Sequence, residues 1–475
     1  MGYGGGARLS ATDKIHLAAK ALSENPLKVS APLGAALAYL GIDSSVPLFH
    51  GAQGCTSFAL VLTVRHMREA IPLQTTALDE VAAILGGDDN LEQALLNLAR
   101  RMKPRFIGVA TTALAATRGE DIAGDLRLIR QRHPELANIA IACAETPDYD
   151  GALEDGWARA TAAVIDEVVQ GDAVSCASER LNILPGVHQT VADIEAIIAC
   201  VEAFGFTAVV LPDISTSLDG TIPAAYVACT LGGTRLEDIT SMGGARHTIA
   251  VGEHMRLPAE RLRAKAGADY TVFPNLTGLA ASDVFIALLM QLSGREAPKA
   301  VRRQRSRLLD AMLDAHFHFG GKRVAIAADP DLLVALSHFF AGMGASIVTA
   351  VASTAHSPAL QSVAADHVHV GDLADFERAA AQAGAELLVT HSHGRQAAAR
   401  LGLPLLRAGF PIFDRLGAMH RCSVLYAGTQ SLLFETANLF MSTLHTPRPE
   451  EFSGEDGAAT MFKETHHAYA KTASH

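Results

Sequence analysis

The stretch VPLFHGAQGC, residues 46–55, sets a short apolar run directly before a turn that contains two glycines. A run of this length bounded by such a turn predicts a buried strand. The arrangement recurs along the chain, where short β-branched runs alternate with helical patterns. This alternation is typical of parallel α/β units rather than of all-α or all-β proteins. The sequence therefore predicts an α/β fold with mostly parallel sheets.

Three α/β blocks of similar size follow one another along the 475 residues. They cover residues 26–172, 173–300 and 301–446, the last opening with a linking helix at 301–316. Strands are expected at 46–49, 106–110, 139–143, 182–184, 208–211, 270–273, 323–328, 346–351, 367–370, 386–390 and 405–407. A helix is expected at 191–204, where Gly205 is a natural stop. Residues 1–25 and 447–475 are predicted to be flexible termini.

Composition excludes several classes of protein. Apolar residues make up 49% of the chain and charged residues 19%, which excludes global disorder. The net charge of −11 comes without clustered basic residues, so no nucleic-acid partner is expected. No segment has the roughly 20 uninterrupted apolar residues of a membrane helix, and the amino terminus lacks the apolar core of a signal peptide. We therefore expect a cytoplasmic protein.

The six cysteines form no recognisable pair. Because none belongs to a CxxC motif, neither a disulfide framework nor a zinc site is indicated. They are Cys55, Cys143, Cys176, Cys200, Cys229 and Cys422. Any cysteine chemistry must therefore rest on isolated thiols.

The loop at residues 50–55 is the strongest candidate site. In open parallel sheets, sites gather in the loops beyond the carboxyl ends of strands, and this loop follows the strand expected at 46–49. Gly51 and Gly54 allow backbone amides to approach a ligand closely, and Cys55 supplies a thiolate. A tight turn with a packed cysteine fits the same residues. From the residues alone, both interpretations stay open.

Weaker candidates follow other strands, and each has a plainer structural explanation. Asp213, Asp219 and the segment 327–331 suit either a hydroxyl-bearing ligand or turns and helix caps. Residues 86–90 suit a divalent cation or a turn before an N-capped helix that starts near Leu91. The glycines at 232–234 and 242–246 lack the spacing of a phosphate-binding loop.

Several histidines are further candidates, while the common catalytic motifs are absent from the sequence. His391 and His393 follow a strand without a third metal ligand nearby, and His466, His467 and His475 lie in the expected tail. No Ser-His-Asp order, nucleophile elbow or HExxH motif is present. We therefore expect no catalytic residues and no self-contained active site.

At HGAQGC and the following VRHMREAIPLQTTALDEVAAILGG, residues 64–87, the sequence resembles the nitrogenase component 1 family. The resemblance continues at residues 26–42, 111–122, 146–157, 309–332 and 404–415 and covers most of the chain. It implies three Rossmann-like α/β domains and a role in nitrogen fixation.

The cysteines indicate the scaffold branch of this family rather than its catalytic β subunits. Those subunits have cysteine at three positions, and here Ser30 and Ala113 occupy two of them while Cys55 is kept. A four-iron, four-sulfur cluster usually takes four thiolates, so one cysteine cannot retain it alone. The resemblance therefore implies that Cys55, beside Gly54, is a bridging metal ligand to a 4Fe-4S cluster shared with the partner NifE.

The resemblance also predicts the roles of two further residues, Phe410 and Leu85. Phe410 stands where the catalytic α subunit has a histidine ligand to the iron-molybdenum cofactor. Because phenylalanine cannot bind metal, the cofactor precursor is expected to be held mainly by NifE. Leu85 matches an apolar contact with the Fe protein, NifH, although core packing explains this residue equally well.

The implied function is maturation of the FeMo-cofactor precursor on a heterotetramer with NifE. Molybdenum and homocitrate would be inserted with the help of NifH, on a precursor that NifB donates. The alternative is a catalytic subunit of a nitrogenase-like reductase, either a nitrogenase β chain or protochlorophyllide reductase. Ser30 and Ala113 count against the first, and residues 146–157 and 308–317 favour the scaffold over the second. A Rossmann-type small-molecule enzyme, such as a nucleotide-sugar transferase, lacks a matching motif.

Overall fold

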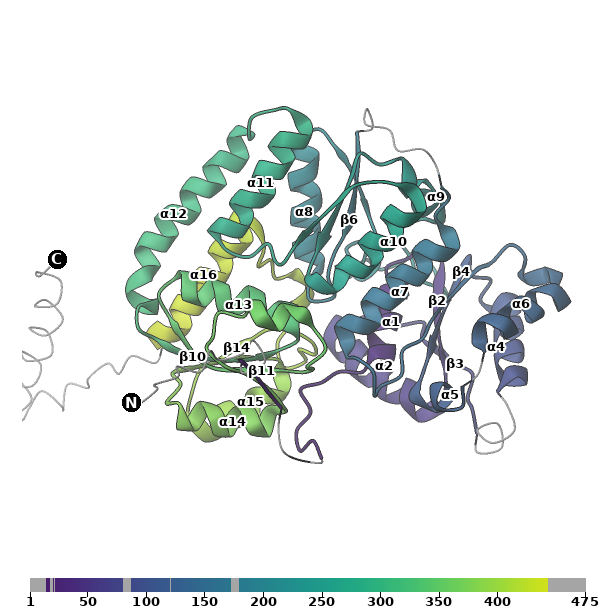
Figure 1. The fold of residues 1–475 in the computed structure, drawn as a ribbon, viewed down its shortest axis with the longest axis horizontal. Coiled ribbons are helices and arrows are strands. Elements are labelled where there is room, and N and C mark those ends of the chain that lie inside the picture. Colours follow the sequence, from purple (N-terminus) through teal and green to yellow (C-terminus); the bar gives the residue numbers. More distant parts are fainter. Residues whose placement is uncertain are drawn as a thin grey trace, which may run out of the picture.

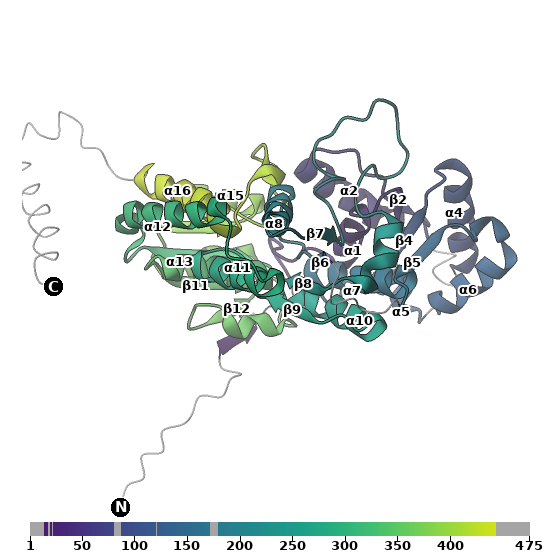
Figure 2. The same cartoon turned by 90° about the horizontal axis from the view of Figure 1, so that it is seen from above.

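The computed structural model describes residues 14–17, 20, 22–79, 87–119, 121–171 and 179–442. Their strands form three separate sheets, and every strand pair in them is parallel. Helices surround each sheet, and the three units lie against one another in both views (Figures 1 and 2). The predicted α/β class with parallel sheets is confirmed.

The first sheet has the order β3-β2-β4-β5. Its strands are β2 Ser45–His50, β3 Gln74–Thr75, β4 Phe106–Thr111 and β5 Ala140–Ala144. Its helices are α1 Ala31–Leu40, α2 Gln53–Met67, α4 Asp88–Arg101, α5 Ala113–Thr117, α6 Ile122–Arg132 and α7 Leu153–Val168. Every residue of β2 and β4 is buried, as expected for strands that helices cover on both faces.

Helix α1 is buried over its whole length because α7 lies directly against it. A Cβ at Gly34 would stand 2.0 Å from the Leu153 carbonyl oxygen, and one at Gly156 would stand 1.8 Å from that of Ala31. The two glycines therefore let the helix backbones touch. This contact fixes α7 and the loop before it relative to the first sheet.

The second sheet has the order β7-β6-β8-β9. Its strands are β6 Arg180–Leu184, β7 Thr207–Val210, β8 His247–Val251 and β9 Tyr270–Phe273, and its helices are α8 Val191–Ala203, α9 Leu236–Thr240, α10 Arg256–Ala266 and α11 Leu279–Ser293. Helix α8 begins with a capping box between Thr190 and Asp193 and ends before Gly205, whose φ is 85°. Strand β8 was not predicted from the sequence, although its last four residues are buried and largely apolar.

The third sheet has the order β1-β12-β11-β10-β13-β14. Its strands are β1 Ile15–Leu17, β10 Arg323–Ala328, β11 Ser346–Ala352, β12 Val368–Val370, β13 Leu387–Thr390 and β14 Leu405–Arg407. Its helices are α12 Lys299–Phe319, α13 Pro330–Gly342, α14 Leu373–Gln382, α15 Arg395–Leu401 and α16 Leu425–Ser442. Long α12 packs on α16 beside this sheet (Figure 1).

Strand β1 corrects the prediction that residues 1–25 are loosely held throughout. Ile15 pairs with Val368, and Leu17 pairs with Val370, so this segment adds an edge strand to the third sheet. The Glu24 N–H also donates to the Asp372 carboxylate at 2.7 Å. An edge strand depends on a distant pairing partner, which a short local pattern in a glycine-rich terminus does not reveal.

The three units meet at one junction. Loops that follow β6, β9, β10 and β14 converge there with α1, α2 and α7 of the first unit. The carboxyl ends of strands from the second and third sheets thus face the same interior region, where sites of open α/β sheets usually form.

Candidate functional site

The predicted cysteine lies on the first turn of α2, directly beyond the end of β2. Helix α2 begins at Gln53 after Ala52, which places Cys55 among the residues whose N–H groups have no partner inside the helix. The Cys55 side chain is exposed. Upstream, the buried His50 Nδ1 lies 3.1 Å from Thr76 Oγ1, a contact that holds the end of the strand.

The two glycines of the loop have different roles. A Cβ at Gly51 would come within 2.2 Å of Thr112 Oγ1, so packing requires glycine there. A Cβ at Gly54 would meet no atom within 4 Å. Gly54 therefore leaves open space next to Cys55 within this chain.

Opposing electrostatic effects act on the Cys55 thiol. Partial burial of the sulfur, and then the negative charge of Asp148, raise the Cys55 pKa above its ordinary value. The amino-terminal end of α2 favours a negative charge on the same sulfur. A metal ion that binds the sulfur displaces the thiol proton outright. The raised pKa therefore keeps the Cys55 thiol protonated in the free chain at neutral pH, and only a bound cation would convert it to a thiolate.

Cys55 and Gly54 line a cavity of about 510 Å³ between the first and third units. Lys28 and Ser30 come from the segment before α1, and the Lys28 Nζ donates to the Asp148 carbonyl oxygen at 2.8 Å. His391 and His393 enter from the turn after β13. Cys55 and the two histidines, which were separate candidates in the sequence, therefore share one cavity.

The two histidines differ in burial. His391 is only 4% exposed, and its burial, with the nearby His393, lowers its pKa to about 3. Its Nδ1 accepts the His393 N–H at 3.3 Å, so it caps the short turn that follows β13. His393 packs edge-on against Phe413, with ring centroids 5.0 Å apart. Each ring therefore has a structural contact, although the buried His391 Nε2 has no hydrogen-bond partner within the described chain, and His391 stays neutral at physiological pH.

The other described cysteines lie elsewhere. Cys143, Cys200, Cys229 and Cys422 are partly or fully buried, and none of them lines the Cys55 cavity. Cys176 lies outside the described residues. Ser30 precedes α1 without a side-chain cap hydrogen bond, and Ala113 is the first residue of α5. Within the described chain, the cavity therefore offers a single thiol.

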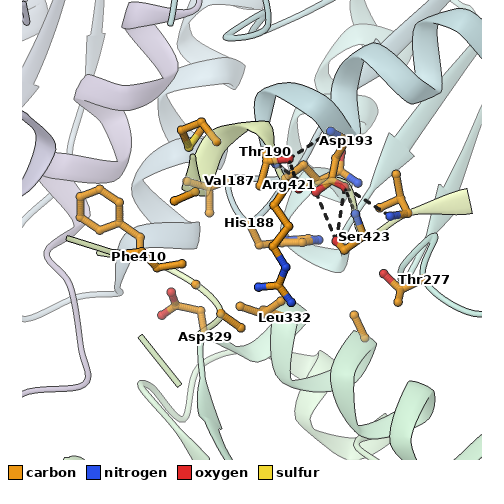
Figure 3. Close-up of a pocket in the computed structure, with 18 of the residues that line it drawn as sticks. Val187, His188, Thr190, Asp193, Thr277, Asp329, Leu332, Phe410, Arg421 and Ser423 are labelled. Atoms are coloured by element: carbon orange, nitrogen blue, oxygen red, sulfur yellow. Dashed lines mark hydrogen bonds between the residues drawn. The ribbon is translucent and has the colours of Figure 1, made fainter. Parts of the chain in front are cut away.

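A second, much smaller cavity of about 90 Å³ lies at the junction of the three units (Figure 3). Phe410 borders it, and the ring of Phe410 packs against buried His66. On the opposite side, the Arg421 side chain extends toward Leu332 and Asp329. Small-molecule pockets usually measure roughly 300–1,000 Å³, so this junction cavity is too small for a large cofactor.

The weaker candidates prove to be structural. Asp213 accepts hydrogen bonds from Ser215 and Thr216, and Asp219 accepts them from Thr221, so both residues form turns. Asp329 precedes α13 and accepts a hydrogen bond from Ser353 Oγ instead of capping the helix.

The two glycine segments also have structural roles. At 232–234, the Gly232 N–H donates to Asp43 and the Gly233 N–H donates to Thr216. The segment 242–246 falls largely in a short 3-10 turn before β8.

The helix expected near Leu91 begins three residues earlier, and the residue before it is Gly87, which has no side chain to cap it. The prediction that a side chain caps the start of this helix was therefore wrong.

Several other candidates, Gly86, Leu85, His466, His467 and His475, lie outside the described residues. In the described chain, no helix combines the length and apolarity that a membrane span requires.

Comparisons with known proteins agree over nearly the whole chain. A family model described as nitrogenase component 1 type oxidoreductase matches residues 30–441. A protein of Mesorhizobium japonicum named nitrogenase iron-molybdenum cofactor biosynthesis protein NifN is 55% identical over 91% of this chain and 94% of its own length. Its namesake in Klebsiella pneumoniae is 38% identical over 90% of this chain and 93% of its own. A solved structure described as nitrogenase Cp1 at pH 6.5 superposes with a TM-score of 0.84 and 28% identity, covering 91% of this chain and 98% of that one.

Proposed function

The chain belongs to the nitrogenase component 1 family, and on that premise we propose that it is one subunit of a scaffold complex for assembly of the nitrogenase iron-molybdenum cofactor. In this proposal Cys55 supplies one thiolate to a four-iron, four-sulfur cluster, and a partner of the NifE type supplies the other ligands. One observation carries the proposal: Cys55 is exposed at a cavity whose described lining holds no second cysteine.

The residues around Cys55 fit a shared cluster better than a cluster held by this chain alone. A 4Fe-4S cluster usually takes four thiolates, and the cavity offers one. Gly54 leaves room beside that sulfur, and the amino-terminal end of α2 favours negative charge there. The chain therefore contributes one ligand, open space and a favourable field, while three ligands must come from elsewhere.

The exposed face of α2 next to Cys55 is consistent with the binding of a protein partner. Phe58 is 69% exposed and Val61 is 52% exposed, and both lie along α2 from Cys55 at intervals of three residues. Residues at this spacing share one face of a helix. Exposed apolar side chains in a row are typical of an interface rather than of free surface. A partner that covers this face would also bring its cysteines near Cys55.

The contributions of this chain follow from its own atoms. When bound, the cluster would supply one-electron transfer. Cys55 would hold one corner of it, the first-turn amides of α2 would tune its potential, and Phe58 would exclude water with the partner's help. The cofactor precursor would be held mainly by the NifE-type partner, since the junction cavity here measures about 90 Å³ and Phe410 offers no metal ligand. Molybdenum and homocitrate insertion with NifH, on a precursor from NifB, completes the proposed pathway.

A reductase subunit is the alternative function. A catalytic β chain would need further cysteines at positions 30 and 113, where this chain has serine and alanine. Neither Ser30 nor Ala113 offers a soft sulfur ligand to iron. This favours the scaffold over the β chain.

Purification of the chain alone and together with the NifE-type partner, both under anaerobic conditions, tests the proposal. We expect the lone chain to bind almost no iron, and the complex to be brown with at least one four-iron cluster per heterodimer. A lone chain that carries a complete four-iron cluster would contradict it, because one thiol cannot retain such a cluster.

A further inference from the structure

A second group of metal-ligating side chains lies in the interior, away from Cys55. Glu154 is on the first turn of α7, His188 is in the loop after β6, and His254 is in the short 3-10 turn Glu253–Met255 after β8. One ligand atom from each lies within 4.8 Å of those of the other two. We propose that Glu154, His188 and His254 bind one zinc ion or a similar divalent transition metal.

The geometry needs only a small adjustment to bind such an ion. A tetrahedral zinc ion with bonds of about 2.1 Å holds its ligand atoms about 3.4 Å apart. Side chains whose ligand atoms are already within 4.8 Å reach that spacing through rotamer shifts of roughly 1 Å. Two imidazoles and one carboxylate form a familiar zinc ligand set, whereas calcium and magnesium prefer oxygen ligands alone.

His254 is oriented as metal-bound histidines usually are. Its Nδ1 is hydrogen-bonded to the Asp331 carboxylate, which also accepts the His254 backbone N–H at 3.0 Å. This pairing fixes the tautomer and directs the Nε2 lone pair away from Asp331. The present partner of Nε2 is the Val187 N–H at 3.3 Å, a long contact that a metal bond can replace.

His188 supplies the second imidazole. Its ring lies edge-on to that of His254, with centroids 6.0 Å apart. Within the described chain, its buried Nδ1 has no hydrogen-bond partner. An imidazole binds a metal ion through the lone pair of an unprotonated ring nitrogen. A buried ring nitrogen without a partner is costly unless a ligand satisfies it.

The charge balance around Glu154 also favours a cation. Glu154 is 2% exposed, and its Oε1 accepts the Asp331 N–H at 2.9 Å. Burial and the nearby carboxylates of Asp331 and Asp329 disfavour an unpaired negative charge on Glu154. A buried carboxylate among other carboxylates must take up a proton or face a cation. A divalent ion would neutralise the Glu154 carboxylate and bind both imidazoles at the same time.

The proposed ion would link all three units. Glu154 belongs to the first unit and the two histidines to the second, while Asp331, on α13, orients His254 from the third. His188 also lines the junction cavity of about 90 Å³. The metal would therefore stabilise the junction from inside, independently of the cluster proposed at Cys55.

Zinc binding by the full chain in complex with its partner tests this proposal. After chelation and dialysis against zinc, we expect one zinc per chain in the wild type and in the control His247→Gln, a histidine on β8 outside the group. His188→Gln and Glu154→Gln should bind zinc at least tenfold more weakly. Equal zinc content in all four proteins, or none in the wild type, would overturn the site.

A second measurement needs only the wild type, in case the variants do not fold. X-ray absorption of the zinc-loaded complex should show imidazole and oxygen ligands without sulfur, and zinc should raise its melting temperature. A zinc–sulfur shell would mean that the ion sits on a cysteine, and would refute the assignment to Glu154, His188 and His254.

Discussion

The Phe410 ring packs edge-on against the His66 imidazole, with centroids 4.8 Å apart at an interplanar angle of 73°. His66 lies near the end of α2 in the first unit, and Phe410 follows β14 in the third. The His66 Nδ1 also accepts the Ile412 N–H at 2.8 Å. The pair joins the two units and reduces the space at the junction, at the position where the family's α subunit is expected to have a histidine ligand.

Truncation of Phe410 tests this structural role. Phe410 is 6% exposed, so Phe410→Ala should leave a cavity and lower the free energy of unfolding by about 3–5 kcal/mol. Phe317 on α12 is 75% exposed, and Phe317→Ala is the matched control, with an expected change under about 0.5 kcal/mol. Denaturant unfolding of both variants measures the difference. Equal midpoints for the two would show that Phe410 does not support the junction.

Acid should weaken the same contact. Burial lowers the His66 pKa to about 4 in the folded chain, whereas an unfolded histidine titrates near 6.5. Between these values the unfolded state binds more protons than the folded state. The contribution of His66 to the free energy of unfolding is therefore fully present above about pH 6.5 and is lost as the pH drops toward 4. The loss attributable to His66 is at most about 3 kcal/mol. Urea unfolding at several pH values should show a shallower acid slope for His66→Gln than for the wild type, and identical slopes would exclude this contribution.

The exposed face of α2 should determine partner binding without affecting the fold. Phe58→Asp places a charge in the proposed interface, so we expect partner affinity to fall at least tenfold while the melting temperature of the isolated chain stays unchanged. Leu128→Asp on α6, where the side chain is 55% exposed, is the control and should bind normally. Co-purification followed by calorimetry measures both. Full affinity in Phe58→Asp would place the partner on another surface.

The sequence predicted the buried strands well because their signal is local. Runs such as those of β2, β4 and β10 are short, apolar and bounded by turns, and burial on both faces of a parallel sheet produces that pattern. Strand β8 was missed because it follows directly on the glycine turn at 242–246 and opens with His247 and Thr248. Strand β1 was missed because its pairing with β12 joins residues about 350 positions apart in sequence.

The site was only partly predictable. Cys55 and Gly54 stand out through the glycine loop, but their shared cavity with His391 and His393 depends on how the first and third units pack. The group of Glu154, His188 and His254 was not predicted at all, because its members come from a helix, a loop and a short 3-10 turn and lack metal-binding spacing in the sequence. For such groups the only sequence signal is a polar residue just after a strand, which most often forms a turn or a cap.

The central proposal is that, among the described residues, Cys55 alone supplies a ligand to a cluster shared with a partner, and removal of that sulfur tests it most directly. The complex should be purified with Cys55→Ala and with Cys229→Ala, whose thiol lies outside the cavity and contacts the Met102 carbonyl oxygen at 3.2 Å. Iron counting and electron paramagnetic resonance should show loss or marked weakening of the shared cluster in Cys55→Ala, with a normal melting temperature, and a full signal in Cys229→Ala. Wild-type iron content and an unchanged spectrum in Cys55→Ala would contradict the account.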